Sequence, residues 1–382
     1  MSWEIKKLSD CCVSIADGDH QAPPKADTGI PFVTIANINA TNQFDFSNTM
    51  FVPQAYYDRL DSKRKAQKGD ILYSVVGSFG IPVYMRETIP FVFQRHIAIL
   101  RPNETILPQF LYYTMLSRDF YMMADAAALG AAQRTVSLTA LRNMKIAVPP
   151  MGVQKKIADT LSAYDDLIEN NQKQIKLLEE AAQRLYKEWF VDLRFPGHET
   201  TPITDGIPEG WKCEAVDDIY SIKYGKTLPT TKINTTDKYP VYGASKVLGY
   251  YSEKNCENYA ILITSRGNAG VVHRTHHKES FVTNNSFIVM TQNEKLHNAF
   301  IYFQMQQLNF KSIVTGACQQ QLTNNLISQK KVVIPSTSIL EMFNAIADPL
   351  FERIEAIIAQ NSNLAEARDR LLPKLMNGEI EV

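Results

Sequence analysis

The stretch "GAAQRTVSLTALRNMKIAVPP" runs from Gly130 to Pro150, and the stretch "GACQQQLTNNLISQKKVVIPS" runs from Gly316 to Ser336. Both begin with Gly-Ala-x-Gln and continue through a polar segment of helical composition. Both then end on an apolar strand that follows a basic residue and leads to a proline. A pattern that recurs in this detail indicates an internal duplication, which is the first feature to establish in a new sequence.

The duplication extends well beyond these two stretches. Four more pairs of segments lie 190 positions apart: Ile71-Leu72 and Ile261-Leu262, Gly77-x-x-Gly80 and Gly267-x-x-Gly270, Phe91-Val92 and Phe281-Val282, and Phe110–Met115 and Phe300–Met305. The offset falls to 186 at the Gly-Ala-x-Gln stretch. Such a unit is far longer than a solenoid repeat, so we expect each copy to be a domain followed by one more element.

A seam of apolar residues follows the proline in each copy and predicts a long helix. In the first copy the steps alternate between four and three if Asn171 counts as one position: Ile157, Leu161, Tyr164, Ile168, Ile175, Leu178, Ala182, Leu185 and Trp189. The second seam is looser and has Asn361 at the equivalent position: Ile346, Leu350, Ile354, Ile357, Leu364, Leu371 and Leu375. A seam of this length needs a partner helix, which the other copy supplies. The alternative is two amphipathic helices that each pack only on their own domain.

The segments before each seam combine strands and helices. Residues 70–76, 91–101, 259–265 and 280–290 are predicted strands, and residues 108–125 are a predicted helix. We therefore predict an α+β fold with two tandem mixed α/β domains. They are separated by a pair of long antiparallel coiled-coil helices, and the whole forms a pseudo-twofold repeat. The predicted segments are a first domain (1–150), a first long helix (151–195), a Pro- and Gly-rich linker (196–210), a second domain (211–336) and a second long helix (337–382).

Composition limits the class of protein. With 45% hydrophobic and 21% charged residues, the chain has the makeup of an ordinary globular protein. No apolar run is long enough to span a membrane. The five scattered cysteines favour reduced thiols and a cytoplasmic location over a disulfide framework. The formal net charge of zero neither favours nor excludes nucleic acid, because a local basic face decides such binding.

Motifs of catalysis and cofactor binding are missing from the sequence. There is no Walker loop, no G-x-G-x-x-G after a predicted strand, and no Asn/Asp-Pro-Pro-aromatic motif of an amino-methyltransferase. His273, His276 and His277 cluster, but no cysteine or carboxylate has ligand spacing to them, which favours a surface loop over a zinc site. The pattern indicates recognition rather than catalysis, with no catalytic residue and no metal on this chain.

Polar side chains suited to nucleic acid recur at the duplicated positions. Gln94 aligns with Asn284 and Gln133 with Gln319, and side-chain amides can pair with adenine in the major groove, whereas arginine favours guanine. The glycine pairs would let a loop approach a phosphate backbone. The alternatives are that the glycines make tight hairpins and that the glutamines brace loops. The candidate DNA contacts are Ser74, Gly77, Ser78, Gly80, Gln94, Arg95, Gln133, Arg134, Ser265, Arg266, Gly267, Asn268, Gly270, Asn284, Asn285, Gln319 and Gln320.

The chain resembles the specificity subunit of type I restriction–modification systems. Tyr164–Asp192 is similar to that family's central conserved helix, and Arg370–Ile380 is similar to its C-terminal one. The stretches "GDILYSVVGSFG" and "ILITSRGNAG" resemble the strand and turn of its target recognition domains. The resemblance covers essentially the whole chain. One departure is "TNNSF" in the second copy, where the family commonly shows an Asn-Gln-type turn like "FQRHI".

The resemblance implies a non-catalytic subunit in which two target recognition domains each bind one half of a split double-stranded DNA sequence. The two long helices would act as a spacer and dock the methyltransferase (modification) subunits, and restriction subunits would join afterwards. S-adenosylmethionine would then belong to the modification subunit, and ATP and magnesium to the restriction subunit, with no cofactor on this chain. Two other interpretations of the chain are a DNA methyltransferase or nuclease fused to recognition domains, and a coiled-coil adaptor that does not bind DNA.

Spacing along the helices leads to two more expectations. About 35 residues at a rise of 1.5 Å give a helix of roughly 50 Å, which would place the domains about one DNA turn apart. If the helices run antiparallel, Asn171 and Asn361 coincide and should pair, because an unsatisfied buried amide costs about 1–3 kcal/mol. The alternative is that both amides face solvent or the methyltransferase subunits.

Overall fold

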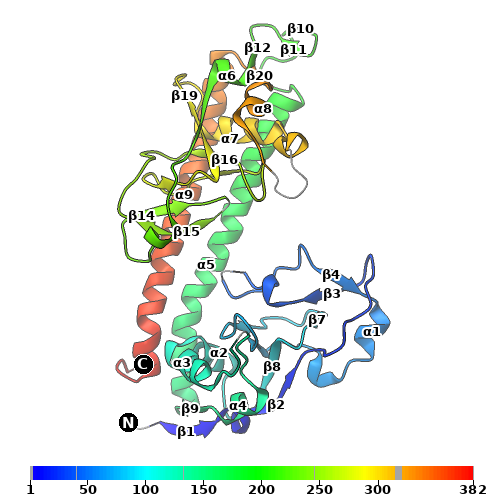
Figure 1. Cartoon of the computed structure of the whole chain (residues 1–382), viewed down its shortest axis with the longest axis vertical. Coiled ribbons are helices and arrows are strands. Elements are labelled where there is room, and N and C mark those ends of the chain that lie inside the picture. Colours follow the sequence, from blue (N-terminus) through cyan, green and yellow to red (C-terminus); the bar gives the residue numbers. More distant parts are fainter. Residues whose placement is uncertain (1–2, 40, 132, 245, 315–320, 382) are drawn as a thin grey trace. The chain divides into compact units, whose positions relative to one another are not determined.

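The computed structural model describes residues 3–39, 41–131, 133–244, 246–314 and 321–381. The chain forms two compact units. Unit 1 comprises Met1–Glu169 with Asn363–Val382, and unit 2 comprises Asn170–Ser362. Two long helices, α5 (Met151–Tyr186) and α9 (Thr337–Met376), each contribute a segment to both units (Figure 1).

Unit 1 contains three small sheets. The first has the order β2-β8-β5-β6, formed by Cys12–Asp17, Ile97–Pro102, Ile71–Ser74 and Pro82–Tyr84. The second has the order β4-β3-β7, formed by Met50–Val52, Ile30–Val33 and Val92–Phe93, and the third pairs β1 (Glu4–Lys7) with β9 (Lys145–Val148). The helices are α1 (Gln54–Asp58), α2 (Pro108–Leu116), α3 (Arg118–Ala127) and α4 (Leu138–Asn143), with short 3-10 turns at Leu8–Cys11, Ile35–Asn37 and Ser62–Arg64.

Unit 2 repeats this plan with the same strand orders. Its first sheet is β13-β19-β16-β17, formed by Tyr220–Tyr224, Ser286–Thr291, Ile261–Thr264 and Val272–Arg274. Its second is β15-β14-β18, formed by Val247–Tyr251, Tyr239–Tyr242 and Phe281–Val282, and its third pairs β12 (Lys212–Ala215) with β20 (Lys331–Ile334). The remaining elements are α6 (Val216–Ile219), α7 (Asn298–Gln307), α8 (Asn324–Ser328), a π-helical turn at Lys187–Val191 after α5, 3-10 turns at Thr230–Lys232 and Phe310–Ile313, and a hairpin of β10 (Ile203–Thr204) and β11 (Ile207–Pro208). The matching topologies confirm the duplication and the α+β fold.

Three predicted elements are each divided in the structure. The expected strand over 91–101 is two strands, β7 and β8, with a turn at residues 94–96 between them, and the same break separates β18 from β19. The expected helix over 108–125 is α2 and α3, because Ser117 leaves the helical conformation with ψ 148°. The Ser117 hydroxyl accepts a hydrogen bond from the Phe120 amide at 3.2 Å and so caps α3. A serine that can cap a new helix overrides the apolar periodicity around it.

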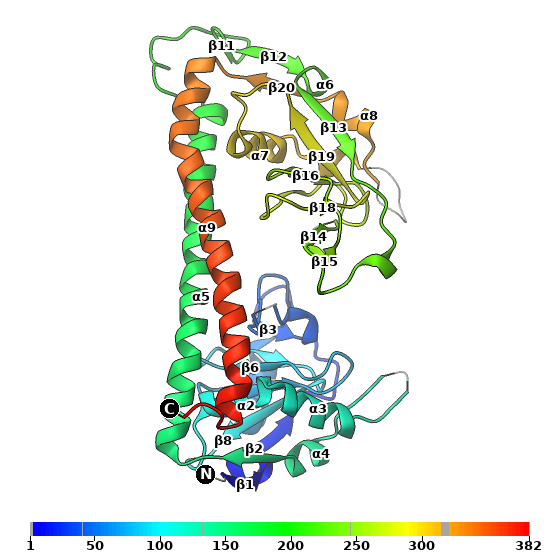
Figure 2. The same cartoon turned by 90° about the vertical axis from the view of Figure 1, so that its left-hand side faces the viewer.

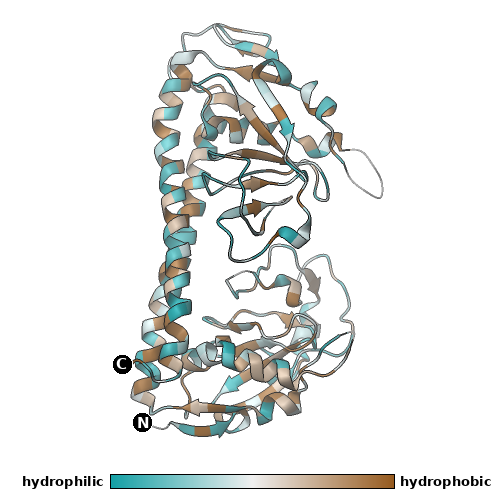
Figure 3. Cartoon of the chain, turned by 60° about the vertical axis from the view of Figure 1, so that its left-hand side comes forward, coloured by the Kyte–Doolittle hydropathy of each residue, from teal (hydrophilic) through white to brown (hydrophobic). Residues whose placement is uncertain are grey.

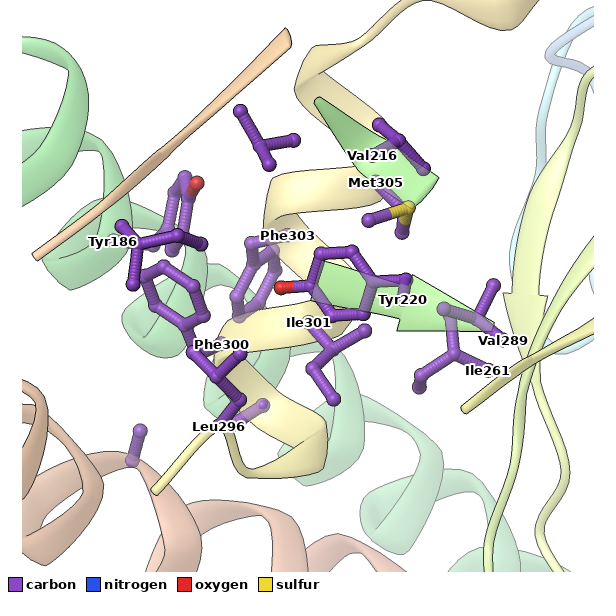
Figure 4. Close-up of a cluster of buried hydrophobic side chains, with 14 of the residues drawn as sticks. Tyr186, Val216, Tyr220, Ile261, Val289, Leu296, Phe300, Ile301, Phe303 and Met305 are labelled. Atoms are coloured by element: carbon purple, nitrogen blue, oxygen red, sulfur yellow. The ribbon is translucent and has the colours of Figure 1, made fainter. Parts of the chain in front are cut away.

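Aromatic side chains dominate the core of unit 2. Tyr186 of α5 lies 5.6 Å from both Phe300 and Phe303 of α7, measured between ring centroids (Figure 4). The Tyr220 hydroxyl donates to Gln304 Oε1 at 2.5 Å, so the polar tip of a buried ring is satisfied. Burying a large apolar side chain stabilises a fold by about 1.5–3 kcal/mol. This cluster therefore fixes α5 to the domain that follows it in the chain.

The seam predicted for α5 is buried or half-buried at every position, whereas that of α9 needs one correction. Ile346 is 48% exposed, and Ala347 and Phe343 are fully buried instead. The corrected seam alternates steps of four and three from Phe343 through Ala347 and continues to Leu375. Hydrophobic and hydrophilic residues accordingly alternate around each long helix (Figure 3).

In unit 2, the segments of α5 and α9 run antiparallel (Figure 2). Two asparagines meet in their seam. Asn171 Nδ2 donates to Asn361 Oδ1 at 2.8 Å and to Gln360 Oε1 at 3.2 Å. The Asn171 side chain is buried, with 3% exposed. The contact is the one that the spacing of the two seams predicts for antiparallel helices.

A carboxylate with little or no exposure to solvent fastens each domain to its helices. In unit 1, Asp165 of α5 accepts hydrogen bonds from the Tyr113 hydroxyl at 2.6 Å and from Arg368 of α9 at 2.5 Å. In unit 2, Glu355 of α9 pairs with Arg274 of β17, and both side chains are less than 10% exposed. Asp165 and Glu355 are 190 positions apart, so the duplication preserves this anchoring carboxylate while its partners differ.

Candidate nucleic-acid interface

The glycine-rich loop of unit 1 connects β5 to β6 and exposes Gly77 and Ser78. Gly80 has a structural role, because a Cβ at this position would lie 2.6 Å from Cδ2 of Tyr121. The Tyr121 ring stacks on Phe79 with centroids 5.9 Å apart, and this packing requires the glycine. The hairpin interpretation therefore applies to Gly80, while Gly77 and Ser78 remain available to a ligand.

The equivalent loop of unit 2 exposes Arg266, Gly267 and Asn268. Nothing lies within 4 Å of a Cβ built on Gly267, so this position is open. Gly270 is buried, and a Cβ there would lie 2.7 Å from the Lys311 amide nitrogen. Like Gly80, Gly270 serves close packing of the loop and not contact with a ligand.

Two serines of the predicted set are placed where no phosphate can reach them. Ser74 is fully buried, and its hydroxyl accepts from the Ile81 amide at 2.9 Å. Ser265 is also fully buried, and its hydroxyl donates to the Asn284 carbonyl at 3.2 Å. Both brace the loop from inside the sheet, so we remove them from the candidate contacts.

Three separate motifs of unit 1 meet around one concave site. A cavity of about 330 Å³ lies between the end of β2, the glycine loop, the turn at 94–96 and the segment that leads into α4. Its lining combines polar and apolar residues: Asp17, His20, Val75, Val76, Arg95, His96, Gln133, Thr135, Val136, Ser137 and Leu138. The sequence pointed to Arg95 and Gln133 but missed Asp17, His20, Thr135 and Ser137. Asp17 and His20 lie outside the repeated segments, and Thr135 and Ser137 lie inside the Gly130–Pro150 repeat, where the second copy has Gln321 and Thr323.

The two arginines of unit 1 that are candidate DNA contacts, Arg95 and Arg134, have different environments. Arg134 donates through Nη1 to Asp125 Oδ1 and through Nη2 to the Asp125 carbonyl, both at 2.5 Å, and its guanidinium lies 5.4 Å from the Phe79 ring centre. Arg95 is exposed and makes no ion pair or side-chain hydrogen bond with any residue that the structure describes. Burial and the neighbouring Arg95 charge lower the pKa of His96, which keeps its imidazole neutral near pH 7. Arg95 is therefore the arginine free to bind a ligand.

Backbone hydrogen bonds correct the alignment of the two copies by one residue. The amides of Arg95 and Asn284 donate to the carbonyls of Asp19 and Lys226, each at 3.1 Å. The equivalent amides one position earlier belong to Gln94 and Thr283, which donate to Val33 and Tyr242. The structural equivalent of Gln94 is therefore Thr283, that of Arg95 is Asn284, and that of His96 is Asn285.

The shift has a simple origin in chain length. Residues 85–91 connect β6 to β7, whereas the shorter segment 275–280 connects β17 to β18. The offset returns to 190 at α2 and α7, because the segment 292–297 is one residue longer than 103–107. Gln319 and Gln320 lie outside the described residues. Close to them, the Val136 amide donates to Val75 and the Leu322 amide donates to Ser265, so Val136 and Leu322 are equivalent and the offset there is 186.

The histidine cluster is built into the body of unit 2. His273 lies in β17, and neither of its ring nitrogens, both buried, has a hydrogen-bond partner among the described residues. Burial lowers the pKa of His273 to about 4, so the ring is neutral near pH 7. His276 Nδ1 lies 3.4 Å from Glu355 Oε1, and the Tyr242 hydroxyl forms a hydrogen bond with His277 Nδ1 at 2.9 Å. Within the described part of the chain, no group of three or more His, Cys, Asp or Glu side chains could hold a metal ion.

We expect unit 2 to lose about 2 kcal/mol of stability through His273 between pH 7 and pH 5. The unfolded chain binds this proton near pH 6.5, while the folded chain does not, so the contribution is complete above pH 6.5 and falls as the pH drops toward 4. Denaturation of the unaltered chain and of His273→Leu at both pH values measures the difference. His198→Gln is the control, since His198 Nδ1 already lies 2.9 Å from a carbonyl oxygen. Equal pH dependence in all three proteins would contradict the assignment.

The cysteines and helices add two further observations. Of the cysteines in the described residues, Cys11, Cys12, Cys213 and Cys256 are all free of disulfide bonds. Among the described helices, none is both long and apolar enough to cross a membrane.

Known proteins resemble the chain over both copies. A family model described as the type I restriction modification DNA specificity domain matches residues 2–180 and 208–365. The specificity subunit of the type I restriction enzyme MjaIX from Methanocaldococcus jannaschii is 28% identical over 349 residues, which cover 84% of this chain and 80% of that protein. The specificity subunit of the HindI enzyme from Haemophilus influenzae is 24% identical over 412 residues, with 84% and 88% covered.

A solved structure shares the fold. The crystal structure of the type I restriction-modification system S subunit from M. genitalium has a TM-score of 0.58 and 18% identity, and the match covers 98% of this chain and 96% of that one. The family match spans both repeats and most of the two long helices. The chain therefore belongs to the family of type I restriction modification DNA specificity domains.

Proposed function

We propose that this chain is the non-catalytic DNA-recognition subunit of a type I restriction–modification complex and reads a split, asymmetric site. Each unit would bind one half of the site through its glycine loop and the neighbouring turn. Modification and restriction subunits would dock on the chain and supply the chemistry, with S-adenosylmethionine on the former and ATP and magnesium on the latter.

One observation carries this proposal. The two units hold the same loops on the same strands, yet the exposed side chains on those loops differ. Val76 of unit 1 corresponds to Arg266 of unit 2, and Ser78 corresponds to Asn268. A shared scaffold with different polar groups is what two recognition domains need in order to read different sequences.

Co-expression with a modification subunit, followed by single-molecule sequencing of the host DNA, tests the proposal. We expect methyladenine within one motif that has two unlike half-sites and an unread spacer. A palindromic motif would contradict the asymmetry. Methyl transfer by the purified chain alone would contradict the non-catalytic role.

Arg266 is expected to contact phosphate, because it is exposed on the open loop of unit 2 beside Gly267. Replacing Arg266 with alanine should weaken binding to cognate and random DNA alike and reduce the salt slope of binding by about one. Titrations of the assembled complex at several salt concentrations measure both quantities. Arg59→Ala, at an exposed position after α1, is the control. A loss confined to cognate DNA would instead show that Arg266 reads a base.

A further inference from the structure

The corrected register changes which side chains of the two units are equivalent. Arg95 and Asn284 lie within tight turns that are closed by the Ile97 and Ser286 amides, which donate to the carbonyls of Gln94 and Thr283 at 3.0 and 3.2 Å. The backbone amide of Arg95 also donates to the Asp19 carbonyl, just after β2. In the same way, the amide of Asn284 donates to the Lys226 carbonyl, just after β13. The backbone at Arg95 and the backbone at Asn284 are therefore fixed at equivalent positions of their own units, and only the side chains differ.

The side chains at these two positions are free to bind. Arg95 is exposed, Asn284 is half-buried, and neither makes a side-chain hydrogen bond or ion pair with a residue that the structure describes. By contrast, Thr283, the equivalent of Gln94, is 3% exposed and cannot reach a ligand. Arg134 is engaged by Asp125. Arg95 and Asn284 are thus both accessible and unengaged, whereas the pair of Gln94 and Thr283 has one buried member.

The surroundings of Arg95 suit a base edge. Arg95 lines the 330 Å³ cavity together with Gln133, Asp17 and His20, so hydrogen-bonding side chains share one concave surface with it. A guanidinium pairs in a bidentate way with O6 and N7 of guanine, and an asparagine amide pairs with N6 and N7 of adenine. Rigid placement of the backbone is what such directional pairing requires.

We propose that Arg95 and Asn284 are equivalent specificity-determining residues, one in each half-site, and that Arg95 reads a guanine where Asn284 reads an adenine. This assignment rests on the proposed function of the chain in DNA recognition. It replaces the pairing of Gln94 with Asn284 that the sequence alone suggested.

Exchanging the two side chains tests the assignment. The complex with modification subunits is expressed with the unaltered chain, with Arg95→Asn or with Asn284→Arg, and methyladenine motifs are mapped in each case. Arg95→Asn should lower modification of the original first half-site about 5- to 150-fold and shift one guanine toward adenine, leaving the second half-site unchanged. Asn284→Arg should do the converse in the second half-site.

Two further variants decide the result. Arg59→Asn removes an exposed arginine of the same unit outside the cavity, and its motif should be unaltered. Gln94→Asn tests the earlier alignment, and a changed base with this variant but not with Arg95→Asn would overturn the assignment. An unchanged motif with Arg95→Asn in an assembled, active complex would also overturn it. If the unaltered chain directs no split motif at all, the proposed function fails, and this assignment fails with it.

Discussion

Removal of the Glu355 carboxylate is expected to lower the free energy of unfolding of unit 2 by about 3–5 kcal/mol. Arg274 is 7% exposed, and Glu355 is its closest partner, while Glu179 lies farther away at 3.8 Å. Glu355→Ala would therefore leave a buried guanidinium without adequate compensation. The cost comes from the stranded charge and not from the attraction alone, since burying either ion already carries a desolvation penalty.

A double replacement separates these two contributions. Arg274→Met with Glu355→Leu removes both charges and keeps an apolar contact with Phe351, whose ring centre lies 4.4 Å from the Arg274 guanidinium carbon. We expect the double variant to recover most of the stability that Glu355→Ala loses. A double variant as unstable as the single one would show that the pair contributes net stability and is not merely tolerated.

Fluorescence can confine the measurement to unit 2. Two of the three tryptophans, Trp189 and Trp211, are buried in the core of unit 2, and Trp3 belongs to unit 1. In a Trp3→Phe background, denaturant titration therefore reports unit 2 alone. Arg184→Ala is the control within unit 2, because its pair with Glu180 is exposed on both sides and worth about 0.5 kcal/mol or less. A loss for Glu355→Ala no larger than that of this control would contradict the prediction.

The sequence was sufficient for features that depend on periodicity. A heptad seam is visible in residue types alone, and its one polar position located the contact between Asn171 and Asn361. Ile346 was assigned wrongly because Ala347 is small and does not signal burial, although its Cβ faces the core. The helix break at Ser117 was missed for a similar reason, since the apolar residues continue across it.

The candidate site was less predictable, because it depends on backbone register. Phe91-Val92 and Phe281-Val282 match by residue type. In the structure, however, Phe281 pairs with Val241 of β14 as Val92 pairs with Phe32 of β3, so the equivalent of Phe281 is Val92 and not Phe91. The shorter connection before β18 causes the slip, and no residue type marks its position. Ser74 was assigned wrongly for another reason. A polar residue in a strand usually indicates an exposed face, but β5 is buried at all four of its positions, Ser74 included.

Leucine at both Asn171 and Asn361 is expected to raise the free energy of unfolding by about 1–3 kcal/mol, because a polar seam position is retained at a cost in stability. Asn361→Leu alone should lower it by roughly 1 kcal/mol, since the buried Asn171 amide would keep only Gln360. Opposite signs for the single and the double variant would show that the two amides are coupled. Ile357→Leu changes a buried seam position without touching the amides and serves as the control.

The functional consequence concerns register. Paired amides penalise any slipped alignment of α5 on α9, whereas leucines tolerate several alignments. In complexes with modification subunits, we expect the unaltered chain to direct methylation at one spacer length and the double leucine variant to direct it at more than one. Methylation mapping measures this directly, and Ile357→Leu should retain a single length. A double variant that unfolds more easily and keeps one spacer length would show that the amides serve stability and do not set the register.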